Sequence, residues 1–270
     1  MHGVNGDVFG FVDLARLMDS EQPVYGLQAV GLDGRTARHI SIESMAAHYV
    51  EEIRSFQPED PYFVGGYSMG GLIAYEVAQQ LRRLGQTVGL LVLIDTWPIG
   101  VIPKSIYARN MASYIPRRCL LHLRHLWQIP NSERLAFLRG RWDALRIIAA
   151  SNLVKPPQVV ATSPAIQAPQ VPGYSDYYHA LAAIYQLKPY PGPIDIIVGD
   201  GETPELHRYW RHMARGGVSV HRIGGGHLEM KTPQRLPVLA QALAAVLQRA
   251  QQAAAPPKSL TPPPHADHIS

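Results

Sequence analysis

A serine flanked by glycines is the first feature of the sequence that could do chemistry. Ser68 lies in Gly66-Tyr67-Ser68-Met69-Gly70, between an apolar run and a helical pattern. A serine on such a sharp strand-to-helix turn projects its hydroxyl above the sheet, and the flanking glycines allow strand and helix to approach. The following helix also directs its N-terminus at negative charge that develops there. We therefore predict that Ser68 is a nucleophile; the alternative is a plain glycine-rich turn.

A histidine late in the chain is the predicted base. His227 follows three glycines, between the last predicted strand and the closing helix. In α/β-hydrolases the chain order is serine, acid and histidine, and the histidine occupies this loop. Its imidazole takes the serine proton during attack and returns it to the leaving group.

Two aspartates compete for the role of the acid that orients the histidine. Asp95 directly follows the apolar strand that ends at Ile94, and Asp200 follows the next strand, which ends at Val198. Either carboxylate could bind the second imidazole nitrogen and stabilise the imidazolium. Chain order within the fold slightly favours Asp200, because the acid usually follows the later strand.

The oxyanion hole of this fold uses two backbone N–H groups. One belongs to the residue after the nucleophile, here Met69, and the other to a loop near the N-terminus. In the stretch at residues 2–7 the best candidate is the N–H of Val4. We expect His2 to shape this loop rather than to act as a second base.

The elements that must position these residues alternate between strands and helices, which predicts a mostly parallel sheet with helices on both faces. The pattern predicts strands at residues 24–29, 62–66, 88–94, 193–198 and 218–223, and helices at about 8–18, 42–56, 69–84 and 236–251. Ser41 is placed to cap the second of these helices. We predict an α/β-hydrolase fold.

The domain boundaries follow from breaks in this alternation. Residues from about 98 to 190 contain no predicted strand and several proline-rich breaks, so we expect an inserted helical lid there. The domain spans residues 1–252 and is expected to lack its first strand, and residues 253–270, rich in Pro and Ala, read as a disordered tail. Between Lys104 and Arg146, Lys and Arg outnumber acids; this indicates a docking face for an acidic partner or, at least as readily, a solvated helix face.

Composition narrows the classes of function. The chain has 270 residues, 46% of them hydrophobic and 17% charged, which suits one globular domain. A net charge of +4 without a recognition motif argues against nucleic-acid binding. The sequence shows neither an apolar run long enough to span a membrane nor a signal segment for secretion. We therefore expect a cytoplasmic protein. Cys119 is the only cysteine and matches no nucleophile motif. No metal, nucleotide or flavin motif is present, so we expect no cofactor.

These stretches together resemble the type I thioesterase domains that end nonribosomal peptide and polyketide synthases. The resemblance covers about residues 1–247 and rests on residues 2–6, 23–32, 61–71, 94–97, 190–192, 210 and 226–227. It implies that Asp95 rather than Asp200 is the acid, with Asp200 kept as the alternative. It also implies that Ser68 attacks an acyl or peptidyl thioester on the phosphopantetheine of a carrier protein, and that the chain leaves by hydrolysis or cyclisation. The competing hypotheses are a carboxylester hydrolase or lipase and a catalytically silent carrier-binding module.

Overall fold

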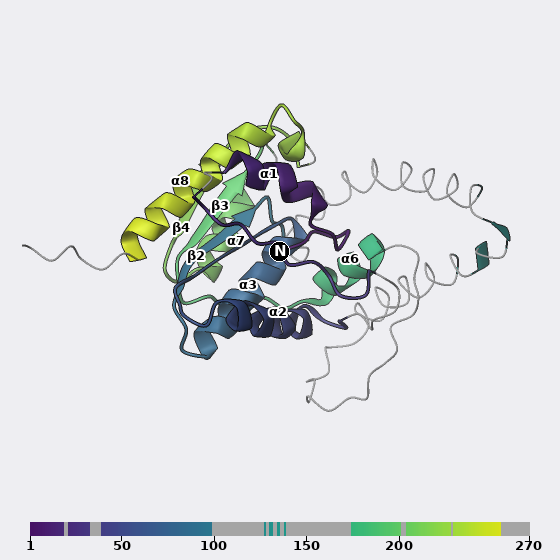
Figure 1. Ribbon diagram of the computed structural model, residues 1–270, viewed down its shortest axis with the longest axis horizontal. Coiled ribbons are helices and arrows are strands. Elements are labelled where there is room, and N and C mark those ends of the chain that lie inside the picture. Colours follow the sequence, from purple (N-terminus) through teal and green to yellow (C-terminus); the bar gives the residue numbers. More distant parts are fainter. Residues whose placement is uncertain are drawn as a thin grey trace, which may run out of the picture.

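A four-stranded parallel sheet lies at the centre of the computed structural model (Figure 1). The strands run in the order β1 (Tyr62–Tyr67), β2 (Val88–Ile94), β3 (Ile194–Val198) and β4 (Val218–Arg222). The structure describes residues 1–18, 21–32, 39–98, 174–200, 204–227 and 229–254, and a few isolated positions between 127 and 138. Because all four strands are parallel, their carboxyl ends meet at one edge of the sheet, where polar residues from separate strands can converge.

The sequence predicted these four strands because parallel strands are covered on both faces and read as apolar runs. In β2 every residue but Gly89 is buried. The prediction of a strand at residues 24–29 is wrong, since this stretch joins no sheet. Its backbone instead bonds the N-terminal loop, with His2 N donating to Leu27 O at 3.2 Å and Ala29 N donating to Gly6 O at 2.8 Å. Ala29 is buried, whereas Val24 and Tyr25 remain exposed.

Helices cover both faces of the sheet, which confirms the predicted α/β architecture (Figure 1). One face carries α2 (Ile42–Phe56), α3 (Met69–Arg83), α6 (Tyr174–Ile184) and α7 (Pro204–Met213), and the other carries α1 (Val12–Leu17), after the short turn η1 (Phe9–Phe11), and α8 (Leu236–Ala254). The predicted cap of α2 is confirmed, because the Ser41 side chain accepts a hydrogen bond of 3.0 Å from Ser44 N.

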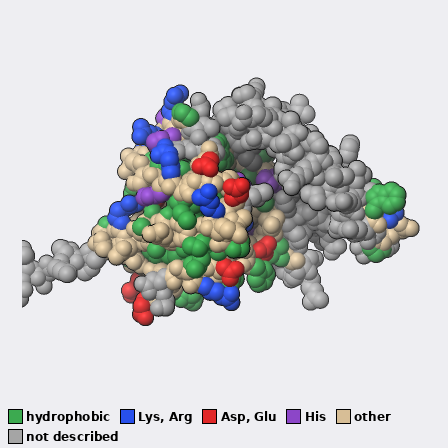
Figure 2. Space-filling view, turned by 90° about the horizontal axis from the view of Figure 1, so that it is seen from above, with side chains coloured by type: hydrophobic (Ala, Val, Ile, Leu, Met, Phe, Trp, Pro, Cys, Tyr) green, Lys and Arg blue, Asp and Glu red, His purple; other side chains and the backbone are tan. Residues whose placement is uncertain are grey.

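The predicted lid is described only at its C-terminal end. Helix α6 lies within the range 98–190, whereas the charge-biased stretch between 104 and 146 lies, except for isolated positions, outside the described residues, as do Cys119 and residues 255–270. No described helix is long and apolar enough to cross a membrane. On the face shown in Figure 2, hydrophobic side chains reach the surface alongside charged side chains of both signs.

Candidate active site

Ser68 occupies a strained turn between β1 and α3. Its backbone angles are φ 57° and ψ −125°, a region that residues other than glycine rarely adopt. The flanking glycines are required by close backbone contacts: a Cβ on Gly66 would lie 2.0 Å from Gly70 O, and a Cβ on Gly70 would lie 2.5 Å from His2 O. The structure therefore has the strand–turn–helix geometry that the motif predicts, with Ser68 at the N-terminus of α3.

Asp95 directly follows the last residue of β2, next to the serine turn. Ser68 N donates to Ile94 O at 2.8 Å, and Asp95 N donates to Ile197 O of β3 at 2.7 Å. The Asp95 backbone has φ 45°, and the residue is only 3% exposed. The bond to Ile197 O fixes the backbone of Asp95 at the carboxyl edge of the sheet.

His227 contacts this carboxylate directly. Its Nδ1 lies 2.5 Å from Asp95 Oδ2, across 132 residues of sequence. A carboxylate accepts hydrogen bonds, so this pairing assigns the imidazole proton to Nδ1 and leaves Nε2 to accept one. The His227 side chain remains 40% exposed, so the imidazole is within reach of a bound molecule.

Asp200 has a different partner. Its Oδ2 accepts a hydrogen bond of 2.8 Å from Gly225 N, and its own N donates to Gly225 O at 2.9 Å. Asp200 thus fixes the glycine loop that precedes His227, while Asp95 contacts the imidazole itself. Of the two predicted acids, the geometry joins Asp95 to the histidine.

One predicted oxyanion donor, Met69, lies at the N-terminus of α3, and the other, Val4, lies in the N-terminal loop. Met69 is the first residue of α3, so its N–H has no acceptor within the helix. Val4 lies in a turn closed by a 3.0 Å bond from Gly6 N to Gly3 O, and His2 in the same loop lies against Gly70. Among the described residues no hydrogen bond joins Ser68 to His227, a contact that often tightens only when substrate binds. The donor role of Val4 and Met69 stays a prediction.

Tyr67 is a site residue that the sequence reasoning missed. Its ring stacks on the His227 imidazole, with centroids 4.9 Å apart and planes at 19°. Its hydroxyl donates to the His227 backbone carbonyl, and Lys231 Nζ lies 4.6 Å from the centre of its ring. Burial, with the nearby Asp95 charge, raises the pKa of Tyr67, so the hydroxyl remains a donor. The position of Tyr67 next to Ser68 indicates that it lies near the site. That position alone does not reveal its contact with His227, which is 160 residues away in the chain.

His2 is enclosed behind the site. It is 0% exposed, and burial lowers its pKa to about 4, so the imidazole is neutral near pH 7. Its Nδ1 lies 2.8 Å from Gly3 O. This environment agrees with the expectation that His2 shapes the loop. In the described part of the chain no group of three or more His, Cys, Asp or Glu side chains is arranged to hold a metal ion.

Part of the chain matches a known protein family. Residues 1–114 match the family model of the thioesterase domain. The chain is 27% identical over 249 residues, 92% of its length, to malpibaldin synthetase of Mortierella alpina, and 48% identical over 95 residues, 35% of its length, to polyketide synthase PksR of Bacillus subtilis (strain 168). It spans only 4% of the length of each of these relatives.

A solved structure supports the fold. The NocB thioesterase domain, in covalent complex with a fluorophosphonate nocardicin G analog, superposes with a TM-score of 0.61. The two chains are 21% identical, and the match covers 91% of each. The predicted fold is therefore confirmed, and the resemblance to thioesterase domains is supported by the family match over residues 1–114.

Proposed function

We propose that this enzyme releases an acyl or peptidyl chain from a carrier protein. Two observations support this: residues 1–114 match the thioesterase domain family, and the chain resembles the thioesterase domains of peptide and polyketide synthases. The substrate is a thioester on the phosphopantetheine arm of that carrier. Ser68, His227 and Asp95 carry the reaction. The observation that carries the proposal is the contact of His227 with Asp95 at the sheet edge where Ser68 occupies the strained turn.

The first half-reaction forms an acyl-enzyme. Ser68 Oγ attacks the thioester carbonyl carbon while His227 Nε2 takes the hydroxyl proton, and Asp95 stabilises the resulting imidazolium. Negative charge on the carbonyl oxygen is stabilised by the N–H groups of Met69 and Val4. The tetrahedral intermediate collapses when the C–S bond breaks and His227 returns the proton to the leaving sulfur.

The second half-reaction releases the chain. A water molecule, or a hydroxyl or amine within the acyl chain, attacks the Ser68 ester while His227 accepts its proton. The C–O bond to Ser68 breaks, and the serine regains its proton from His227. Water yields the free acid, and an internal nucleophile yields a lactone or lactam. Both outcomes use the same three residues, so access of water during this step selects between them.

The proposal is tested with a fluorophosphonate probe and a carrier-bound acyl thioester. We expect the probe to label Ser68, labelling to fall sharply in His227→Ala, and both labelling and thioester turnover to vanish in Ser68→Ala. A folded protein that is not labelled would instead be a silent carrier-binding module. A labelled protein that cleaves simple esters faster than carrier thioesters would be a carboxylester hydrolase. Either result overturns the proposal.

A further inference from the structure

The loop that carries Val4 lies between two helices. On one side the His2 carbonyl lies against the first turn of α3, where a Cβ on Gly70 would come within 2.5 Å of it. On the other side the His2 ring packs on Tyr178 of α6, with ring centroids 5.4 Å apart. At the far end of the turn, a Cβ on Gly6 would lie 3.3 Å from Tyr178 Cε2. Tyr178 therefore contacts the loop on both sides of Val4.

Hydrogen bonds alone do not fix the His2 ring to the surrounding fold. Its Nδ1 lies 2.8 Å from the carbonyl of its own neighbour, Gly3. Its Nε2 is buried and, among the described residues, has no hydrogen-bond partner. The ring is thus oriented by packing, between the edge contact with Tyr49 at 5.9 Å and the tilted contact with Tyr178. Removing one aromatic wall would leave the ring, and the loop backbone attached to it, free to shift.

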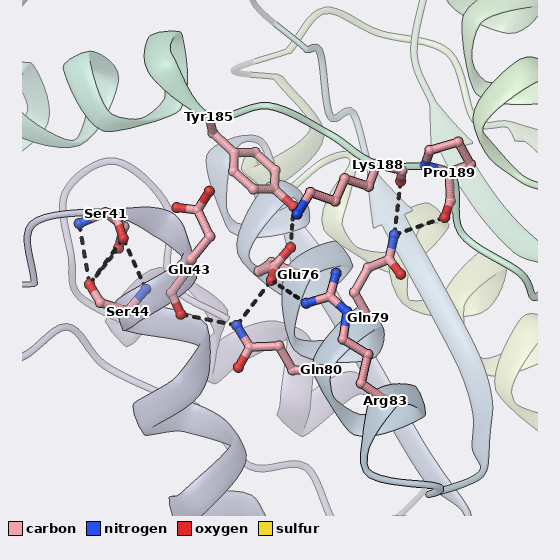
Figure 3. Close-up of polar contacts among 10 residues, drawn as sticks. All are labelled: Ser41, Glu43, Ser44, Glu76, Gln79, Gln80, Arg83, Tyr185, Lys188 and Pro189. Carbon is pink, nitrogen blue, oxygen red and sulfur yellow. Dashed lines mark hydrogen bonds and ion pairs between the residues drawn. The ribbon is translucent and has the colours of Figure 1, made fainter. Parts of the chain in front are cut away.

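Helix α6 is itself attached firmly to the nucleophile helix (Figure 3). Tyr185, just after α6, donates a hydrogen bond of 2.7 Å to Glu76 Oε2, and Glu76 is buried in the middle of α3. Gln79, also on α3, donates to Lys188 O at 2.8 Å. Burial and the Glu76 charge raise the pKa of Tyr185, which keeps its hydroxyl protonated and donating. The segment that directly follows α6 is therefore held to α3 by polar contacts, of which the one between Tyr185 and Glu76 is buried.

We propose that Tyr178 is a positioning residue for the oxyanion hole: it holds the His2 ring so that the Val4 N–H stays directed at the reacting carbonyl oxygen. The contact between Tyr185 and Glu76 fixes the helix from which Tyr178 acts. This inference rests on the proposed function. Because α6 belongs to the range predicted as an inserted lid, that region contributes to the rate of the chemical step and does more than enclose the substrate.

The test compares Tyr178→Leu, which removes the ring, with Tyr178→Phe, which keeps it. The measurements are kcat and KM with a small soluble acyl thioester, and the rate of Ser68 labelling by a fluorophosphonate. We expect kcat and the labelling rate of Tyr178→Leu to fall about 10- to 100-fold, with KM nearly unchanged. Deleting an oxyanion donor lowers kcat about 10²- to 10³-fold, and displacing the donor should lower kcat by less. Tyr178→Phe restores most of the rate, since the ring contact remains.

The matched control is Tyr177→Leu, on the same helix. Tyr177 is also buried, its hydroxyl donates to His39 O at 2.8 Å, and its ring contacts the Tyr178 ring with centroids 5.6 Å apart. Because Tyr177→Leu leaves the Tyr178 ring in place, we expect it to lower kcat less than Tyr178→Leu. An equal loss of kcat in Tyr177→Leu would show that any damage to α6 has this effect and would overturn the inference. If Tyr178→Leu does not fold, Tyr178→Met replaces it, because methionine fills irregular space without a ring.

The outcomes separate this inference from the proposed function. A wild-type protein that neither labels at Ser68 nor turns over the thioester overturns both. A wild-type protein that does both, together with a folded Tyr178→Leu protein of the same kcat, overturns the positioning role alone. A fall in kcat that Tyr178→Phe does not restore also overturns it, because the hydroxyl rather than the ring would then be responsible.

Discussion

Replacing Asp95 by asparagine should remove most of the activity while keeping the fold. Asparagine has nearly the same size as aspartate and tolerates the positive φ of 45° at this position. Its amide, however, offers a donor where the carboxylate accepted a bond from His227 Nδ1 at 2.5 Å. A donor at that place favours the imidazole tautomer with its proton on Nε2, which cannot accept the Ser68 proton.

The size of the effect follows from the chemistry of that tautomer. The same substitution in the serine protease triad lowers kcat about 10⁴-fold, which corresponds to about 5 kcal/mol of transition-state stabilisation. Asp95 is 3% exposed, so water cannot take over the role of the carboxylate. We expect a loss of about 10³- to 10⁴-fold in kcat for Asp95→Asn.

Asp200→Asn is the matched control, because this carboxylate receives a bond from Gly225 N that an amide oxygen can also accept. We expect kcat to change by less than about tenfold in this variant. Single-turnover acylation by a small acyl thioester measures the effect, and thermal melting confirms that both variants are folded. If Asp95→Asn stayed within tenfold of the wild type, or if Asp200→Asn lost more, the assignment of Asp95 as the acid would be refuted.

Three further substitutions test other contacts. Tyr67→Phe removes the hydroxyl that bonds the His227 carbonyl; a net hydrogen bond of about 0.5–1.5 kcal/mol predicts a fall in kcat of about 2- to 10-fold by steady-state kinetics, and an unchanged kcat would contradict it. Burial lowers the pKa of His2 to about 4, whereas the pKa of histidine in the unfolded chain is about 6.5. As the pH falls, the unfolded state therefore takes up a proton before the folded state does. We expect the free energy of unfolding to be about 2 kcal/mol lower at pH 5 than at pH 7. Urea unfolding at both pH values measures this, and His2→Phe with the same pH dependence as the wild type would rule it out. Gly66→Ala places a methyl group 2.0 Å from Gly70 O, so we expect loss of at least about 3 kcal/mol in thermal or urea unfolding, and a variant as stable as the wild type would disprove the close packing of the turn.

The sequence predicted the serine turn because its motif is local. The contact that requires glycine at position 66 is with Gly70, inside the motif, whereas the contact that requires glycine at position 70 is with His2 of the N-terminal loop. The acid could not be chosen in this way. Asp95 and Asp200 both follow strands that end at the same edge, and their strands are neighbours in the sheet. Which carboxylate meets His227 depends on the path of the glycine loop, and that path is a tertiary property.

Other errors have equally physical causes. The backbone at 24–29 bonds the N-terminal loop while Val24 and Tyr25 stay exposed, and the residue types alone cannot distinguish such an extended stretch from a strand. Helix α7 was not predicted, although Leu206, Trp210 and Met213 are buried at helical spacing. The contact of Tyr67 with His227 joins distant parts of the chain, so no local pattern could reveal it.

The parallel sheet also sets the order in which the site can assemble. Neighbouring parallel strands need long connections between them. The contacts that build the site therefore join residues far apart in the chain, such as His2 with Gly70 and Asp95 with His227. During synthesis the serine turn can form as soon as β1, α3 and β2 have emerged. His227 reaches Asp95 only after β4 has been made and has added to β3. A partly synthesised chain therefore holds a formed but inert serine, and its reactivity appears with the last strand.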